Sequence, residues 1–204
     1  MEKAFAIRQA EFVTSVGLGG DYPERRGIEI AIVGKSNVGK SSIINSLCNN
    51  YKLARVSSSP GKTRLINYFS INNSFYLVDL PGYGFAKAPK IEKQRWGELM
   101  EAYLSSGRVG HIIQLLDIRH APTEEDKQMF RWILYYGVPF TLVATKSDKL
   151  AKSKRLQAAN TAARLLGAPP AAIPYSSFSG EGRDALIAGI GRVVNDSSSF
   201  FGEN

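Results

Sequence analysis

Residues 34–41 read GKSNVGKS, and this stretch decides the fold. It fits the pattern G-x-x-x-x-G-K-[ST] of a P-loop, in which backbone N–H groups surround the phosphates of a nucleotide. The apolar run IEIAIV (28–33) comes directly before it, and a helix is predicted near 39–49. A P-loop lies between a strand and a helix in this way, so the stretch predicts an α/β nucleotide-binding fold.

Further runs of strand length follow along the chain: FYLVDL (75–80), IIQLLD (112–117), FTLVAT (140–145) and AAIPYS (171–176). They are nearly continuous in apolar residues, which is typical of strands buried in a parallel sheet. INYFSI (66–71) precedes the first of them across Asn72-Asn73, which predicts an antiparallel hairpin at one edge. We therefore expect a mostly parallel six-stranded sheet with one antiparallel edge strand and helices on both faces.

Helical periodicity lies between the predicted strands. Apolar residues recur at helical spacing from Trp96 to Leu104 and from Met129 to Leu134. Thr123 is a predicted N-cap because three acidic residues follow it, and Gly137 and Pro139 favour an end to that helix. Two more helices are predicted near 153–166 and 183–195, so that helices alternate with strands through the second half of the chain.

Composition favours a single globular domain of 204 residues. The single Cys48 has no Cys or His at zinc-ligand spacing, and no apolar run approaches the ~20 residues that span a bilayer, so we expect a cytoplasmic protein without membrane insertion. Lysine and arginine outnumber acidic residues 26 to 18, which gives a net charge of +8 and favours polyanionic partners such as nucleic acid. A solvated basic surface is the plainer alternative.

Each residue of the P-loop has an expected role. Gly34 and Gly39 let the backbone wrap the phosphates, Lys40 reaches the β and γ oxygens as a catalytic group, and the Ser41 hydroxyl ligates Mg²⁺. The remaining residues expected to contact nucleotide here are Lys35, Ser36, Asn37, Val38 and Ser42.

Two further motifs follow strands. DLPG places Asp79 to hold Mg²⁺ through water and the Gly82 amide near the γ-phosphate, with Leu80 and Pro81 between them. TKSD places Asp148 to accept hydrogen bonds from N1 and the 2-amino group of guanine, two donors that adenine lacks. The other expected base contacts are Thr145, where many G domains have Asn, Lys146, whose stem can lie along the base, Ser147, and the backbone of Ser176, Ser177 and Phe178.

All these motifs come just past the carboxyl ends of predicted strands, which share one edge of a parallel sheet. This order predicts a GTP-binding G domain over 28–196, with an N-terminal extension (1–27) and a polar C-terminal tail (197–204). An ATP-using transferase that happens to contain TKSD is the alternative, and nucleotide preference separates the two.

The stretches GKSNVGKSS, LARVSSSPGKTRLINYF, LVDLPGYGFAK, DIRHAPTEED and TKSDKL resemble the EngB (YihA/YsxC) family of bacterial ribosome-biogenesis GTPases over about residues 10 to 195. The resemblance implies a Mg²⁺-dependent GTPase that acts in assembly of the large ribosomal subunit, with a connection to cell division and septation. It also implies that Thr63 ligates Mg²⁺. The loop expected to contact nucleotide there comprises Gly61, Lys62, Thr63, Arg64 and Leu65.

Tyr83 stands where many G domains carry the Gln that orients the attacking water. The family resembles G domains with an apolar or aromatic residue at this position, so we expect Tyr83 not to touch the water. Hydrolysis would then be slow alone and would depend on a partner group or on K⁺. Asn37 either helps to hold K⁺ beside the phosphates or only caps the loop.

Two segments are locally basic, KAPKIEKQR (87–95) and KSDKLAKSKR (146–155). The first lies in the loop that should respond to the γ-phosphate, and either segment could bind rRNA phosphates. For the second, a solvated helix face is the favoured interpretation. The expected partners are thus the large ribosomal subunit or its precursors, through rRNA and ribosomal proteins and without DNA specificity. A nucleotide-gated scaffold in cell division, with incidental turnover, is the alternative function.

Overall fold

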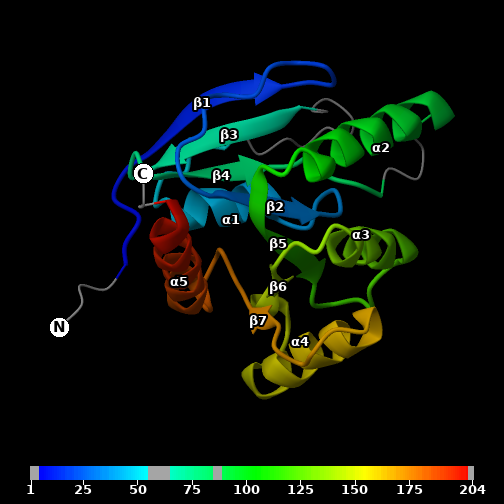
Figure 1. Ribbon diagram of the computed structural model, residues 1–204. Coiled ribbons are helices and arrows are strands. Elements are labelled where there is room, and N and C mark those ends of the chain that lie inside the picture. Colours follow the sequence, from blue (N-terminus) through cyan, green and yellow to red (C-terminus); the bar gives the residue numbers. More distant parts are fainter. Residues whose placement is uncertain (1–4, 55–64, 85–88, 202–204) are drawn as a thin grey trace.

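The computed structural model describes residues 5–54, 65–84 and 89–201, and it shows one twisted sheet covered by helices (Figure 1). In sheet order the strands are β1 (Ala10–Val16), β3 (Ile66–Ile71), β4 (Phe75–Asp79), β2 (Glu29–Gly34), β5 (Val109–Asp117), β6 (Phe140–Thr145) and β7 (Ile173–Pro174). The P-loop strand β2 therefore lies at the centre, with β4 and β5 parallel to it on either side.

Over the residues that the structure describes, the sheet has seven strands instead of the six predicted from the sequence. The additional strand is β1, which lies within the predicted N-terminal extension and pairs antiparallel with β3. β3 also pairs antiparallel with β4, so it is the strand that runs against the others, as predicted, but β1 takes the edge position. The sequence signal for β1 was weak because four of its seven residues are exposed.

In the described part of the chain, five α-helices cover the two faces of the sheet: α1 (Lys40–Leu47), α2 (Lys90–Ser105), α3 (Glu124–Tyr135), α4 (Lys152–Leu166) and α5 (Arg183–Phe201). Helices α1 and α5 pack on one face, where Ile30 and Ile32 of β2 contribute to the core. Helices α2 and α3 pack on the other face, against Ala31 and Val33. Since alternate residues of β2 are buried on opposite faces, its residues 30–33 are all apolar.

The helix limits follow the local signals. Thr123 caps α3: its side chain accepts a hydrogen bond from the Asp126 backbone N–H, and the Asp126 carboxylate accepts one from the Thr123 N–H in return. Gly137 follows the helix in the left-handed region with φ of 63°. Helix α5 continues to Phe201 and so includes part of the predicted C-terminal tail. No helix in the described part of the chain is long and apolar enough to cross a bilayer.

Candidate nucleotide-binding site

The P-loop connects β2 to α1 through a backbone conformation that few residue types can adopt. Gly39 has a φ of 104° and Asn37 a φ of 65°, both in the left-handed region that favours Gly and Asn. A side chain at Gly34 would bring its Cβ to 2.8 Å from Val38 Cγ1 and 3.0 Å from Leu115 Cβ. The sequence GKSNVG therefore meets the steric demands of this turn, which ends at the N-terminus of α1, where phosphate groups bind well.

Lys40 and Asp79 meet at the start of α1. The Lys40 ammonium donates a hydrogen bond to Asp79 Oδ1, and only 15% and 9% of the two side chains are exposed. Asn67 Nδ2 lies 3.5 Å from the other oxygen of the carboxylate, Asp79 Oδ2. The P-loop lysine and the acidic residue expected to serve Mg²⁺ are thus brought together by β2 and β4.

These residues fit a Mg²⁺ site that is completed by a nucleotide. No group of three or more His, Cys, Asp or Glu side chains among the described residues could hold a metal ion alone. Mg²⁺ usually needs only one or two protein oxygens because phosphates and water supply the others. Asp79 and the hydroxyl of Ser41, the second residue of α1, are donors of that kind.

The loop after β4 lies against the P-loop. The Ser36 N–H donates to the Tyr83 carbonyl at 2.8 Å, and the Tyr83 N–H donates to the Gly34 carbonyl at 3.3 Å. A side chain at Gly82 would meet Ser36 Oγ at 3.2 Å, so the close approach favours glycine there. DLPG is therefore held beside the phosphate loop, as its predicted role requires.

Tyr83 points away from the P-loop and into the core. Its hydroxyl donates to Asp126 Oδ1 at 2.7 Å, and its side chain is buried against α2 and α3. Burial raises the pKa of Tyr83 well above its usual value, and the Asp126 carboxylate raises it further, so the hydroxyl stays protonated. This geometry supports the expectation that Tyr83 does not orient a water.

The proposed base site joins the loops after β6 and β7. Ser176 Oγ donates to Asp148 Oδ1 at 2.7 Å and accepts hydrogen bonds from the Phe178 and Ser179 N–H groups at 3.2 Å. The hydrogen bond from Ser176 lowers the pKa of Asp148, with a further contribution from Lys149. Asp148 is therefore an ionised acceptor, as required of a group that reads two guanine donors.

Thr145, at the position where many G domains have Asn, has a structural role that was not predicted from the sequence. Its hydroxyl group lies 2.7 Å from the Val38 carbonyl and 3.1 Å from the Leu116 carbonyl. Thr145 is buried, and these contacts tie the end of β6 to the P-loop and so link the base loop to the phosphate loop.

The remaining predicted contacts divide into three groups. Gly61, Lys62, Thr63 and Arg64 lie outside the described residues, and so does Lys87 of the first basic segment. Leu65 is 40% exposed, and the Phe178 side chain is 92% exposed, while the Phe178 backbone N–H, the kind of group expected at the base, donates to Ser176 Oγ at 3.2 Å. Ser147 is fully buried and donates to Glu181, so its side chain holds the TKSD loop to the loop after β7.

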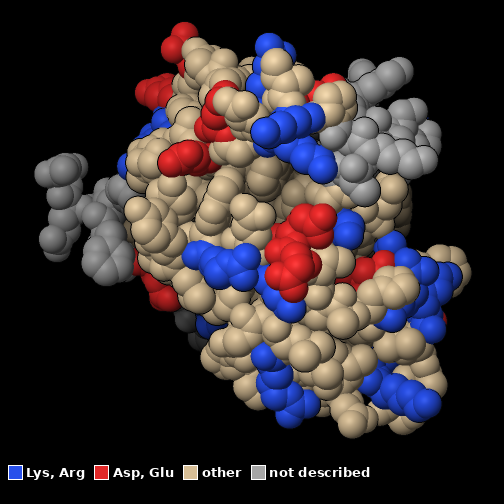
Figure 2. Space-filling model, turned by 90° about the vertical axis from the view of Figure 1, so that its right-hand side faces the viewer, with Lys and Arg blue, Asp and Glu red and all other residues tan. Residues whose placement is uncertain are grey.

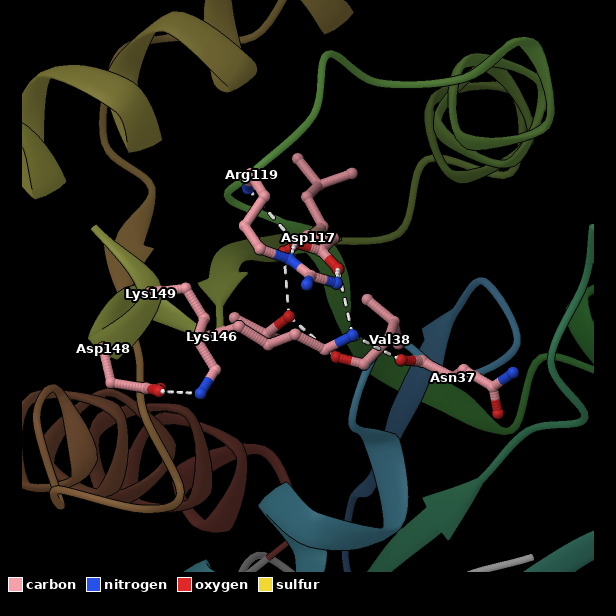
Figure 3. Close-up of polar contacts among 9 residues, drawn as sticks. Asn37, Val38, Asp117, Arg119, Lys146, Asp148 and Lys149 are labelled. Atoms are coloured by element: carbon pink, nitrogen blue, oxygen red, sulfur yellow. Dashed lines mark hydrogen bonds and ion pairs between the residues drawn. The ribbon is translucent and has the colours of Figure 1, made fainter. Parts of the chain in front are cut away.

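Sequence reasoning missed two residues that hold the base loops together. Glu181 accepts hydrogen bonds from Ser147 and, at 2.9 Å, from Arg155. Asp117, the last residue of β5, forms an ion pair with Lys146 at 3.0 Å (Figure 3). Asp117 could have been found by the rule that located the motifs, because it too ends a parallel strand at the shared edge.

Phosphate loop, DLPG loop and base loops thus meet at one edge of the sheet, and this arrangement defines a P-loop GTPase. The comparisons with known proteins agree. A family described as 50S ribosome-binding GTPase matches residues 29–146. The probable GTP-binding protein EngB of Pelotomaculum thermopropionicum is 44% identical over 191 residues, which cover 92% of this chain and 96% of that protein.

The corresponding protein of Fusobacterium nucleatum is 48% identical over 185 residues, which cover 89% of this chain and 94% of its own length. A crystal structure of a probable GTP-binding protein engB matches 82% of this chain and 99% of that chain with a TM-score of 0.68, and at 22% identity it bears on the fold alone. The chain belongs to the EngB family of GTP-binding proteins.

Proposed function

We propose that this GTPase binds the large ribosomal subunit or its precursors and acts there as a nucleotide switch with slow intrinsic hydrolysis. The observation that carries this proposal is the match to the 50S ribosome-binding GTPase family over most of the G domain, from 29 to 146. The net charge of +8 is consistent with a partner rich in phosphate groups. A protein that acts on ribosomal subunits would be located in the cytoplasm. Defects in septation would follow from incomplete subunits.

Nucleotide binding in this proposal uses the residues at the carboxyl edge of the sheet. Lys40 holds the β and γ phosphates, Ser41, Asp79 and Thr63 serve Mg²⁺, and Asp148 reads guanine. Because the Tyr83 hydroxyl is bound to Asp126, charge in the transition state must be stabilised by another group. K⁺ beside Asn37 is the proposed group, and slower hydrolysis when Na⁺ replaces K⁺ would support it.

The switch would reach the surface through α2. Trp96 of that helix donates from Nε1 to the Pro81 carbonyl at 3.0 Å, and its ring packs edge-on against Tyr83 at 6.1 Å between centroids. A shift of DLPG on loss of the γ-phosphate would therefore pull on α2. Lys90 and Lys93 are exposed on the first turn of the same helix.

On one face of the molecule (Figure 2) the basic surface is local rather than continuous. On the face shown in Figure 2, Lys and Arg side chains form separate groups with acidic residues between them. Binding to phosphates would therefore depend on a few positions, and Lys90 and Lys93 on α2 are the first to test.

The test is co-sedimentation of the full chain with large ribosomal subunits across a salt series, with GDP and with a non-hydrolysable GTP analogue. We expect tighter binding with the analogue and an affinity that falls as salt rises. Lys90→Glu with Lys93→Glu should reduce the log–log salt slope by about 1 to 2, because each phosphate contact contributes roughly 0.7 to 0.9.

The matched control is Lys152→Glu with Lys154→Glu, which makes the same charge change on exposed positions of α4. It should leave the salt slope closer to that of the unchanged protein. Equal binding in both nucleotide states would overturn the switch, and a salt slope of the α2 double variant equal to that of the unchanged protein would show that the α2 lysines do not contact the partner.

A further inference from the structure

Asp117 occupies a central place among the nucleotide loops. It ends β5, which pairs with β2 on one side and with β6 on the other. Its Oδ2 accepts hydrogen bonds from Lys146 Nζ at 3.0 Å and Arg119 Nη2 at 2.7 Å, and its Oδ1 accepts from Arg119 Nε at 2.9 Å (Figure 3). Both carboxylate oxygens are thus occupied, one by a lysine of the TKSD motif.

Lys146 is held at both of its ends. Its backbone has a φ of 61°, in the left-handed region, at the turn after β6. Its ammonium group donates to the Asn37 carbonyl of the P-loop at 2.7 Å as well as to Asp117. The four-carbon stem between these ends is flexible in solution, so a fixed ammonium group gives the stem one direction.

The ion pair between Lys146 and Asp117 is largely shielded from solvent, which strengthens the attraction between the two charges. Only 28% of the Lys146 side chain and 19% of the Asp117 side chain are exposed. Burial alone would raise the pKa of Asp117, but the hydrogen bonds from Arg119 and Lys146 outweigh it and hold that pKa well below its usual range. Asp117 is therefore a permanent negative charge at neutral pH, and it does not release Lys146 by protonation.

Arg119 completes the arrangement from the exposed side. Its side chain is 40% exposed, and it grips Asp117 through two side-chain nitrogens and through its own backbone N–H at 3.1 Å. A bidentate arginine fixes the plane of a carboxylate as well as its position. Arg119 thus orients the Asp117 carboxylate so that Oδ2 can accept the hydrogen bond from the Lys146 ammonium group.

We infer that Asp117 is a positioning residue for nucleotide binding: it anchors the Lys146 ammonium group against the P-loop carbonyl of Asn37, and Arg119 in turn orients Asp117. The stem of Lys146 is then held beside Asp148, along the face of the bound purine ring. The inference rests on the assignment of the base site to TKSD. It gives the DIRH sequence after β5 a role in affinity without any contact to the base.

The first test is Asp117→Asn, which keeps the shape of the side chain and removes its charge. We expect the Kd for GDP and the Kd for IDP to rise by the same factor, about 5- to 20-fold, mostly through faster release of nucleotide. The factors should be equal because Lys146 contacts the ring face, which both bases share, whereas Asp148 contacts the edge, where IDP lacks the 2-amino group.

A double-mutant cycle separates positioning from a general loss of structure. In a Lys146→Met background, Asp117→Asn should have almost no further effect on the Kd for GDP, because the group that Asp117 anchors is gone. Arg119→Gln should raise the Kd about 2- to 5-fold and should fold normally, since the arginine is exposed. Asp184→Asn is the matched control at a fully exposed carboxylate on α5 and should change nothing.

Three results would overturn the inference. They are an unchanged Kd in Asp117→Asn, effects of Asp117→Asn and Lys146→Met that simply add, and a clearly larger loss for GDP than for IDP. If Asp117→Asn does not fold, Arg119→Gln takes its place in the same cycle, and additivity with Lys146→Met would overturn the inference in the same way. Failure of the base assignment itself would appear separately, as an Asp148→Asn variant with normal GDP affinity.

Discussion

The two ends of the central strand β2 carry ionic clusters of different construction. At its amino end Glu29 is fully buried and accepts hydrogen bonds from Arg108 Nε at 2.7 Å, Tyr103 at 2.9 Å and Tyr68 at 3.1 Å. At its carboxyl end the charged groups come from neighbouring strand ends and loops and are partly exposed, as in the pair of Asp117, the last residue of β5, and Lys146. One cluster belongs to the core and the other faces an edge that solvent reaches.

The difference teaches which charges serve folding and which serve binding. Arg108 also donates to the Pro23 carbonyl at 2.8 Å and lies over the Tyr22 ring at 5.2 Å, so Glu29 holds the segment before β2 to the turn before β5. Removing one member leaves a buried charge without compensation. At the carboxyl edge the loops exchange partners with phosphates and a base, so substitutions there should cost affinity more than stability.

The largest expected effect is on folding. Glu29→Gln should lower the free energy of unfolding by about 3–5 kcal/mol, because Arg108 loses its buried partner. Urea denaturation measures this, and the Kd for GDP of the folded variant should stay within about twofold. Glu11→Gln, at an exposed glutamate of β1, is the control. A loss below about 1 kcal/mol for Glu29→Gln would remove the contrast between the two ends of the strand.

The next effect is on the base. Asp148→Asn should weaken GTP binding about a hundredfold, because two charge-assisted hydrogen bonds to guanine are lost. Binding of xanthosine triphosphate should improve, because its 2-oxo group needs a donor. Titration calorimetry with both nucleotides measures the exchange, and the urea midpoint should hardly move. Full GTP affinity in this variant would show that TKSD does not read the base.

A third effect is a dependence of stability on pH that comes from a buried histidine at the amino side of the sheet. His111, near the amino end of β5, is 8% exposed, and burial lowers its pKa to about 4. The unfolded chain, with a pKa near 6.5, binds a proton first as pH falls, so His111 costs about 2 kcal/mol of stability between pH 7 and pH 5. His111→Gln should remove this part of the slope. Urea unfolding curves at pH 7 and pH 5 measure this. An equal change of the free energy of unfolding with pH in the unchanged protein and in His111→Gln would contradict the prediction.

The smallest effect concerns the hydroxyl group that links the edge to the core. Tyr83→Phe removes the hydrogen bond to Asp126 and should cost about 1 kcal/mol of stability, since Asp126 keeps its bonds to Thr123. Basal GTP hydrolysis should remain within a few-fold of the unchanged protein. Phe keeps the ring in the core, so it tests the hydroxyl more cleanly than Ala. A loss of hydrolysis beyond tenfold would give Tyr83 a direct role at the water.

The parts of the fold that were predictable are those with local causes. Most residues of the buried strands are apolar, the P-loop turn demands glycine, and Thr123 caps α3 reciprocally, so each can be read within a few residues. The parallel-sheet rule then placed the motifs at one edge. This is why Lys40, Asp79 and Asp148 were predicted together although they are distant in the sequence.

The parts that were missed depend on pairings between distant residues. Glu29 and Arg108 are 79 positions apart, and neither has a neighbour that predicts a buried ion pair. β1 was missed because an exposed edge strand has little apolar pattern of its own, and its structure comes from the edge of β3. Asp117 lies in the DIRHAPTEED stretch that carries the family resemblance, but its partner Lys146 is 29 positions away, so its role depends on the folded sheet.

The pairing of β1 with β3 has a consequence for synthesis of the chain. Ser15 of β1 and Asn67 of β3 are joined by a hydrogen bond across 52 positions, so β1 leaves the ribosome well before its partner exists. During that delay an isolated strand is safer if it carries charged and polar residues, as AEFVTSV does with Glu11, Thr14 and Ser15. When INYFSI, an uncharged strand, finally emerges, β1 is already present to cover its open edge and to keep it from pairing with other chains.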